Sequence, residues 1–243
     1  MRKAFGRFQV LDGLDMEIPR GRITVIIGRS GTGKSVTLKH AMGLMSPDEG
    51  QVFVGDRDIW RLGGAERRKL RLRFGMVFQN AALFDSMSVF DNVAFVLREH
   101  SGLAEEQIHA RVRAALSDVG LLFAADKNPS ELSGGMRKRA GLARALVHTP
   151  EILLYDEPTT GLDPILTAAV DKLIVDTHRA HPGLTTLVVS HDMQACFRIA
   201  DHVVMLHEGR KAAEGPPSWF QSTEDALVRQ FVEGRLDGPM TVE

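Results

Sequence analysis

The sequence predicts an α/β protein with a helical lobe inserted between its two halves. Apolar, strand-like runs alternate with helical patterns near both ends of the 243-residue chain. Residues from about 80 to 148 contain no comparable strands. A glycine-rich stretch at residues 28–35 joins the first of these strands to a helical pattern, which is the context of a phosphate-binding loop.

The predicted strands are short, apolar and rich in β-branched residues. Several are apolar throughout, as parallel strands covered by helices on both faces usually are. In chain order they are residues 23–27, 51–54, 75–78, 152–155, 184–189 and 202–206.

Helices are predicted from apolar residues that recur at helical spacing. A helix over 36–44 follows the glycine-rich stretch, and the central lobe contains helices over 89–97, around 108–119 and over 137–148. Within the second of these lobe helices, Ile108, Val112, Leu116 and Val119 fall on one face.

Two further segments have a helical pattern without an assigned role. The basic run over 67–73 favours a solvated helix face over a surface for lipid headgroups. In the tail after Gly215, Leu227, Phe231 and Val232 have helical spacing, so this segment could dock on its own core or on a neighbouring subunit.

Composition narrows the class of protein. The chain is 44% apolar and 25% charged, with a net charge of −1, which argues against a general nucleic-acid binder. No apolar run approaches the length needed to cross a bilayer, and residues 1–10 do not resemble a secretory signal, so we expect a cytoplasmic location. Cys196 is the only cysteine, and an inert buried thiol is its favoured interpretation.

The glycine-rich stretch matches every fixed position of the phosphate-binding loop. Its glycines allow backbone N–H groups to turn onto phosphate oxygens at the start of a helix. Lys34 is then expected to reach the β- and γ-phosphates of ATP, and the Ser35 hydroxyl to bind Mg²⁺. The predicted loop consists of Gly28, Arg29, Ser30, Gly31, Thr32, Gly33, Lys34 and Ser35.

A second nucleotide element is the apolar strand that ends in Asp156 and Glu157. We expect Asp156 to hold the Mg²⁺ shell and Glu157 to polarise the attacking water. An acidic corner before Pro158 would have the same sequence, but the phosphate-binding loop upstream favours the catalytic interpretation.

Ser133, Gly134 and Gly135 precede the helix predicted over 137–148 and form another pattern suited to an anion. Taken alone, this pattern favours a helix cap. Together with the other motifs, it resembles the signature motif of ATP-binding cassette (ABC) proteins. The resemblance implies that a second copy of the chain completes the site, so that two chains enclose two ATP molecules.

Further positions match the same family in order. The resemblance implies that Gln79 couples the Mg²⁺ site to a membrane partner, that Asp163 contacts the other subunit, and that His191 contacts the γ-phosphate. It also implies that Phe5 stacks on adenine, although Phe8 is close by and either ring could belong to the core.

The family resemblance also implies a division of the chain. The whole chain would be one ABC ATPase domain, with a RecA-like P-loop NTPase core over about 1–79 and 149–215. The helical subdomain would span about 80–148, and a C-terminal tail about 216–243.

Residues 82–93, 131–139 and 228–239 resemble the ATPase subunit of the Mla phospholipid transporters. That resemblance implies a peripheral protein on the cytoplasmic face of the inner membrane, bound to an integral permease and an MCE-domain lipid carrier. Two alternatives stay open: an ABC transporter ATPase for another solute, and a soluble ABC ATPase of translation or DNA repair. A nucleotide switch without turnover is disfavoured by Glu157.

Overall fold

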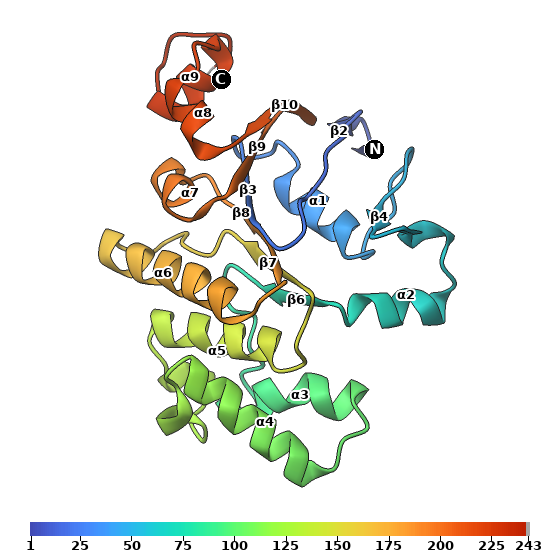
Figure 1. Cartoon of the computed structure of the whole chain (residues 1–243), viewed down its shortest axis with the longest axis vertical. Helices are drawn as coiled ribbons and strands as arrows, with labels where there is room; N and C mark the ends of the chain where they lie inside the picture. Colours follow the sequence, from blue (N-terminus) through green and yellow to red (C-terminus); the bar gives the residue numbers. More distant parts are fainter. Residues whose placement is uncertain (242–243) are drawn as a thin grey trace.

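The computed structural model describes residues 1–241, and its centre is a six-stranded sheet with the order β10-β9-β3-β8-β7-β6 (Figure 1). Only β10 runs antiparallel to its neighbour, and the other pairings are parallel. The strands in that order are Arg210–Gly215, His202–His207, Ile23–Ile27, Thr185–Val189, Ile152–Asp156 and Phe74–Val77.

The register of the parallel strands brings their carboxyl ends to one edge. Val189 of β8 pairs with Ile26 of β3 on one side and with Asp156 of β7 on the other. Val77 of β6 pairs with Tyr155 of β7. The loops after β3, β6, β7 and β8 therefore emerge side by side, which is where ligands bind in open α/β sheets.

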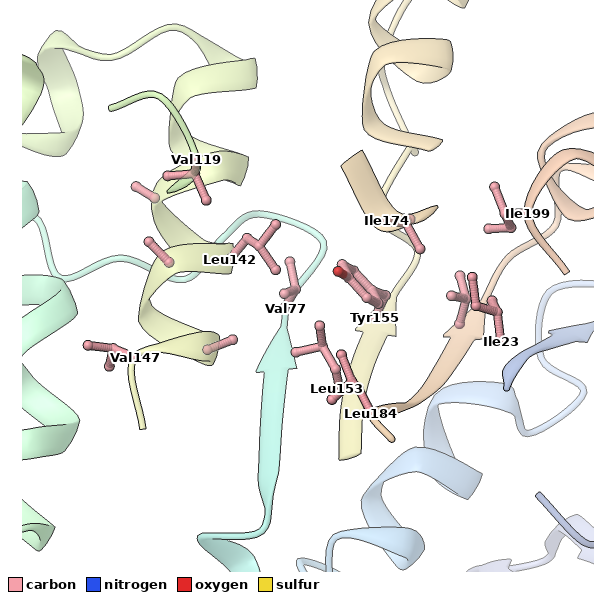
Figure 2. Packing of buried hydrophobic residues seen from close by; sticks show 14 of the residues in the cluster. Ile23, Val77, Val119, Leu142, Val147, Leu153, Tyr155, Ile174, Leu184 and Ile199 are labelled. Atoms are coloured by element: carbon pink, nitrogen blue, oxygen red, sulfur yellow. The ribbon is translucent and has the colours of Figure 1, made fainter. Parts of the chain in front are cut away.

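The sheet separates two hydrophobic cores. Ile23, Val25 and Ile27 of β3 face one core, and Ile26 faces the other, as alternation along a strand requires. Figure 2 shows the first core, in which Leu142 lies beside Val77. The helices around this core include α5 (Gly134–Leu146), α6 (Pro164–Ala180) and α7 (Met193–Ile199). The opposite core contains Leu38 of α1 (Lys34–Ala41).

The central helices form a layer below the sheet in Figure 1. They are α3 (Val89–His100), α4 (Glu105–Asp118) and α5, and each packs against the other two. Ile108, Val112 and Leu116 of α4 are all buried, as their helical spacing predicts.

Two hairpins lie outside the central sheet. The first consists of β1 (Arg2–Phe5) and β2 (Phe8–Asp12), and the second of β4 (Phe53–Val54) and β5 (Arg57–Asp58). The strand expected over 51–54 is therefore shorter than predicted and is not part of the main sheet. Its neighbours explain this, because Gly50 and Gly55 both have positive φ and turn the chain on either side.

The remaining helices lie at the periphery. Three short 3₁₀ turns span Ile59–Arg61, Leu122–Ala124 and Pro129–Glu131. The basic segment forms α2 (Gly64–Arg71), and the tail forms α8 (Pro217–Ser222) and α9 (Ala226–Glu233). Val228 of α9 is buried in the first core, so the tail docks on its own chain. Within residues 1–241, no helix combines the length and apolar character that crossing a membrane requires.

Candidate nucleotide-binding site

The loop between β3 and α1 has the geometry of an anion cradle. Gly33 is the residue at the cap of α1, with φ of 94°, and it has no side chain to bond the first amides of the helix. Gly28 also has a positive φ, and a β-carbon there would collide with the carbonyl oxygen of Leu206. Glycine is therefore required at both positions, and the start of α1 is left for a negatively charged group.

The ammonium of Lys34 is folded back into this loop. Its side chain is only 7% exposed, and Nζ donates to the carbonyls of Gly28 at 2.7 Å and Arg29 at 3.0 Å. Burial lowers the pKa of Lys34, and the nearby Glu157 and Asp156 carboxylates act in the opposite direction. A buried cation held only by carbonyl oxygens and near acids is well placed to bind phosphate.

Ser35 and Asp156 meet at the same edge. Ser35 Oγ donates to Asp156 Oδ1 at 2.9 Å, joining the first turn of α1 to the end of β7. A hydroxyl and one carboxylate are hard oxygen ligands, and Mg²⁺ commonly takes one or two carboxylates together with substrate phosphates. No group of three or more acidic, His or Cys side chains suited to a metal occurs in residues 1–241. Ser35 and Asp156 therefore fit a Mg²⁺ ion that takes two ligands from the protein and others from a nucleotide.

Glu157 is held in an uncommon backbone conformation, with φ of 51°. Its amide donates to the carbonyl of Val189 at the end of β8. Its carboxylate Oε2 lies 2.6 Å from Nδ1 of His191 and accepts from Oγ1 of Thr160 at 2.9 Å. The other oxygen, Oε1, is 4.0 Å from Nζ of Lys34.

Thr160 is a member of this cluster that the sequence did not single out. A threonine in a polar loop after an acidic strand end carries no signal that separates it from Thr159 beside it. The structure distinguishes them because only the Thr160 hydroxyl bonds Glu157 among the described hydrogen bonds.

Gln79 and Phe5 lie outside the hydrogen-bonded cluster around Glu157. Gln79 is exposed, in the turn directly after β6, and so at the same edge as Asp156. Phe5 is 44% exposed and Phe8 80% exposed, so neither ring belongs to the core. The hairpin that carries them reaches the loop through β2, since Gln9 and Val10 line an open pocket with Arg29 to Thr32.

The predicted signature residues lie apart from this cluster. Ser133 is the cap of α5, its Oγ accepting from the amide of Met136 at 3.2 Å, and the space beside Gly134 is open. Asp163 caps α6 by accepting from two amides. Within residues 1–241, no hydrogen bond joins Ser133 to the phosphate-binding loop.

The C-terminal tail makes a contact that the sequence did not suggest. Gln230 of α9 bonds both the amide and the carbonyl of Met240, and Arg29 donates to the carbonyl of Thr241 at 2.6 Å. The end of the described chain therefore lies against the phosphate-binding loop.

Three comparisons bear on this site. A family model described as ABC transporter matches residues 11–160. The "Probable ribonucleotide transport ATP-binding protein mkl" of Mycobacterium leprae is 42% identical over 240 residues, covering 99% of this chain and 69% of that protein. The "Intermembrane phospholipid transport system ATP-binding protein MlaF" of Haemophilus influenzae is 42% identical over 231 residues, covering 95% of this chain and 87% of that protein.

A solved structure is similar over most of the fold. It is described as a dimeric, post-hydrolysis state of the ATP-binding cassette MJ0796 bound to ADP and Pi. The TM-score is 0.79 at 28% sequence identity, and the match covers 89% of this chain and 95% of that one.

Proposed function

This chain belongs to the ABC transporter family as an ATP-binding, ATP-hydrolysing subunit, and we propose that it powers phospholipid transport through a membrane permease. The observation that carries the ATP-hydrolysing role is the cluster at the carboxyl edge of the sheet. There a buried lysine, a hydroxyl–carboxylate pair and a second carboxylate beside a histidine surround the start of α1. These are the groups that phosphoryl transfer from ATP requires.

Each side chain then has a chemical task. Lys34 exchanges its bonds to loop carbonyls for bonds to the β- and γ-phosphates. Glu157 takes the proton of the attacking water through Oε1, because Oε2 is held by Thr160 and His191. His191 is 56% exposed and stands beside Glu157, in reach of a γ-phosphate on the open side.

We assign Mg²⁺ to Ser35 and Asp156, with Gln79 close to the same edge. When bound, the ion would neutralise charge on the phosphates as the terminal bond breaks. The remaining ligands would come from the nucleotide and from water.

A second copy of the chain would complete the site. Ser133, Gly134 and Gly135 are open at the start of α5, and Leu166 lies near Gly135 at the start of α6. Beside Asp163, Ile165 is 82% exposed and Leu166 41% exposed, an apolar surface that a partner subunit would cover. The similarity to a dimeric cassette supports this arrangement.

A membrane partner would lie near the Gln79 turn. Phe78, Phe84 and Phe95 are each more than a third exposed, and the rings of Phe84 and Phe95 are tilted by 55° with centroids 5.1 Å apart. Exposed aromatic side chains of this kind suit a protein interface, here with a permease. We place the protein peripherally on the cytoplasmic face of the inner membrane, with the core and helical subdomain divided near residues 80 and 148.

The transported material distinguishes two versions of this proposal. Equal identities connect the chain to a phospholipid-transport protein and to a probable ribonucleotide-transport protein. The resemblance of residues 82–93, 131–139 and 228–239 to Mla ATPases favours phospholipid, with an MCE-domain carrier as a further partner.

The test is to purify the chain from its native membranes in mild detergent and identify the proteins and lipids that accompany it. The complex is then reconstituted in vesicles, and ATP-dependent movement of labelled phospholipid and of labelled ribonucleotide is measured. A matched Glu157→Gln complex controls for leakage. Phospholipid movement with an MCE-domain partner supports the proposal, whereas ribonucleotide movement removes the lipid assignment and leaves the ATPase assignment. Absence of any membrane partner would favour a soluble ABC ATPase instead.

A further inference from the structure

Helix α5 touches both catalytic loops through two cationic side chains. Lys138 and Arg144 project from this helix, which begins at the Ser133 cap. Each donates to backbone carbonyls outside the helix, one in the loop after β7 and the other in the loop after β6. These two loops carry Glu157 and Gln79.

Lys138 holds the residue that follows Glu157. Its Nζ donates to the carbonyl of Pro158. The side chain is half-buried beside Val77 and Tyr155, and burial lowers the pKa of Lys138. None of the ion pairs in residues 1–241 includes Lys138. The hydrogen bond to the carbonyl of Pro158 therefore offsets the cost of placing this cation among apolar side chains.

Arg144 holds the turn after Gln79. Its two terminal nitrogens donate to the carbonyls of Ala81 and Ala82, each at 2.7 Å. Both alanines have positive φ, 58° and 48°. The turn also sits close to the helix, since a β-carbon added at Gly141 would stand 3.2 Å from the β-carbon of Ala81.

The strained backbone positions coincide with these contacts. Residues 1–241 contain five non-glycine residues with positive φ, and three of them are Ala81, Ala82 and Glu157. Such conformations cost free energy and persist only where the surrounding structure holds them. On each of these two loops, one of the holding groups comes from the same helix, α5.

We infer that Lys138 and Arg144 are positioning residues, which set the geometry of Glu157 and of Gln79 by tying their loops to the signature helix. The inference rests on the proposed role of Glu157 in ATP hydrolysis. A displacement of α5 would then move both loops together, because the two donors share one rigid helix.

The test compares Lys138→Met and Arg144→Met with a matched control, Arg139→Met. Arg139 lies on the same helix and bonds the carbonyl of Val119 at 3.1 Å, within the helical lobe, so its loss removes a similar contact away from both loops. Lys138→Arg keeps a donor and serves as the conservative variant. For each protein we would measure ATP affinity, kcat and backbone hydrogen exchange at residues 79–82 and 157–160.

We expect Lys138→Met to lower kcat about tenfold or more while ATP affinity changes little, because misplacement of a catalytic group costs rate rather than binding. Exchange should increase at 157–160 in Lys138→Met and at 79–82 in Arg144→Met, with Arg139→Met unchanged at both. Lys138→Arg should recover most of the rate.

Equal exchange at both loops in all three Met variants would overturn the inference, as would a wild-type rate in Lys138→Met. The exchange measurement needs no turnover, so it stands even if the wild-type chain proves inactive, which would instead contradict the proposed function. If a Met variant does not fold, the Ala variant at the same position takes its place, because alanine also removes the donor. Exchange that rises only at the tied loop then supports the inference, and unaltered exchange contradicts it.

Discussion

Ser35 Oγ and Asp156 Oδ1 lie 2.9 Å apart, although 121 positions separate them in the chain. The contact joins the phosphate-binding loop to the end of β7, where parallel strands bring their loops together. Both oxygens are hard metal ligands, and they lie at the N-terminus of α1, where the helix dipole and free amides favour phosphate.

We therefore predict that Asp156→Asn raises the Mg²⁺ concentration needed for half-maximal ATP hydrolysis by about tenfold or more, because the ion loses its one charged protein ligand. Asparagine still accepts the Ser35 hydroxyl, so folding should be preserved. The measurement is ATPase rate against Mg²⁺ at fixed ATP, with a melting curve as the control. An unchanged Mg²⁺ requirement would remove Asp156 from the metal site.

Glu157→Gln should keep ATP binding and lower kcat about 100-fold or more, since the amide retains hydrogen bonds but cannot take a proton from water. Affinity for ATP is measured by titration and turnover by phosphate release. Glutamine has nearly the size and shape of glutamate, so it can keep the contacts that Thr160 and His191 make with Oε2. Near-normal turnover would contradict the role of Glu157 as the base.

Lys34→Ala should weaken ATP binding itself, by about 2 kcal/mol, which is the range for a hydrogen bond to a charged group. Titration of the variant with ATP measures the change, and unchanged affinity would contradict the contact between Lys34 and phosphate.

The Lys34→Ala variant also tests whether each ATP site is built from two chains. Mixed with Ser133→Arg chains in equal amounts, it should recover about a quarter of wild-type activity, because half the dimers are mixed and each has one intact site. No recovery, with dimerisation confirmed, would count against a site built from two chains.

Much of the fold follows from local pattern. The phosphate-binding loop and the strands β3, β7, β8 and β9 carry continuous apolar runs between recognisable turns, and the structure places them within a residue or two of the prediction. The antiparallel edge strand β10 and the hairpin strands were missed or shortened. In β10 the side chains alternate between exposed and half-buried, and β4 has only two residues, so neither carries an apolar run.

The sequence motifs identified loops that the structure brings together at the carboxyl edge of the sheet, but not every side-chain contact within and between them. The contact between Thr160 and Glu157 is local, but the sequence does not show which hydroxyl of the loop makes it. Nothing near Lys138 in the sequence indicates that its side chain reaches Pro158, because this contact depends on how α5 and the loop after β7 pack. The same holds for Arg29 and Thr241, which are 212 positions apart.

Cys196 is fully buried in α7. Burial, with the Asp192 charge acting in the same direction, raises the pKa of the thiol from 9.0 to about 12. The native protein should therefore react with thiol reagents at neutral pH only as fast as it unfolds, whereas the protein in denaturant reacts at once.

The raised pKa of Cys196 also makes stability depend on pH. Because the thiol of the unfolded chain loses its proton at a lower pH than the buried thiol, the free energy of unfolding should fall as pH rises above 9. Cys196→Ala should remove the thiol's share of that fall, and chemical denaturation at pH 8 and pH 10 measures it. Rapid labelling of the native protein, or an identical pH dependence in the variant, would show that the thiol is not buried as the structure has it.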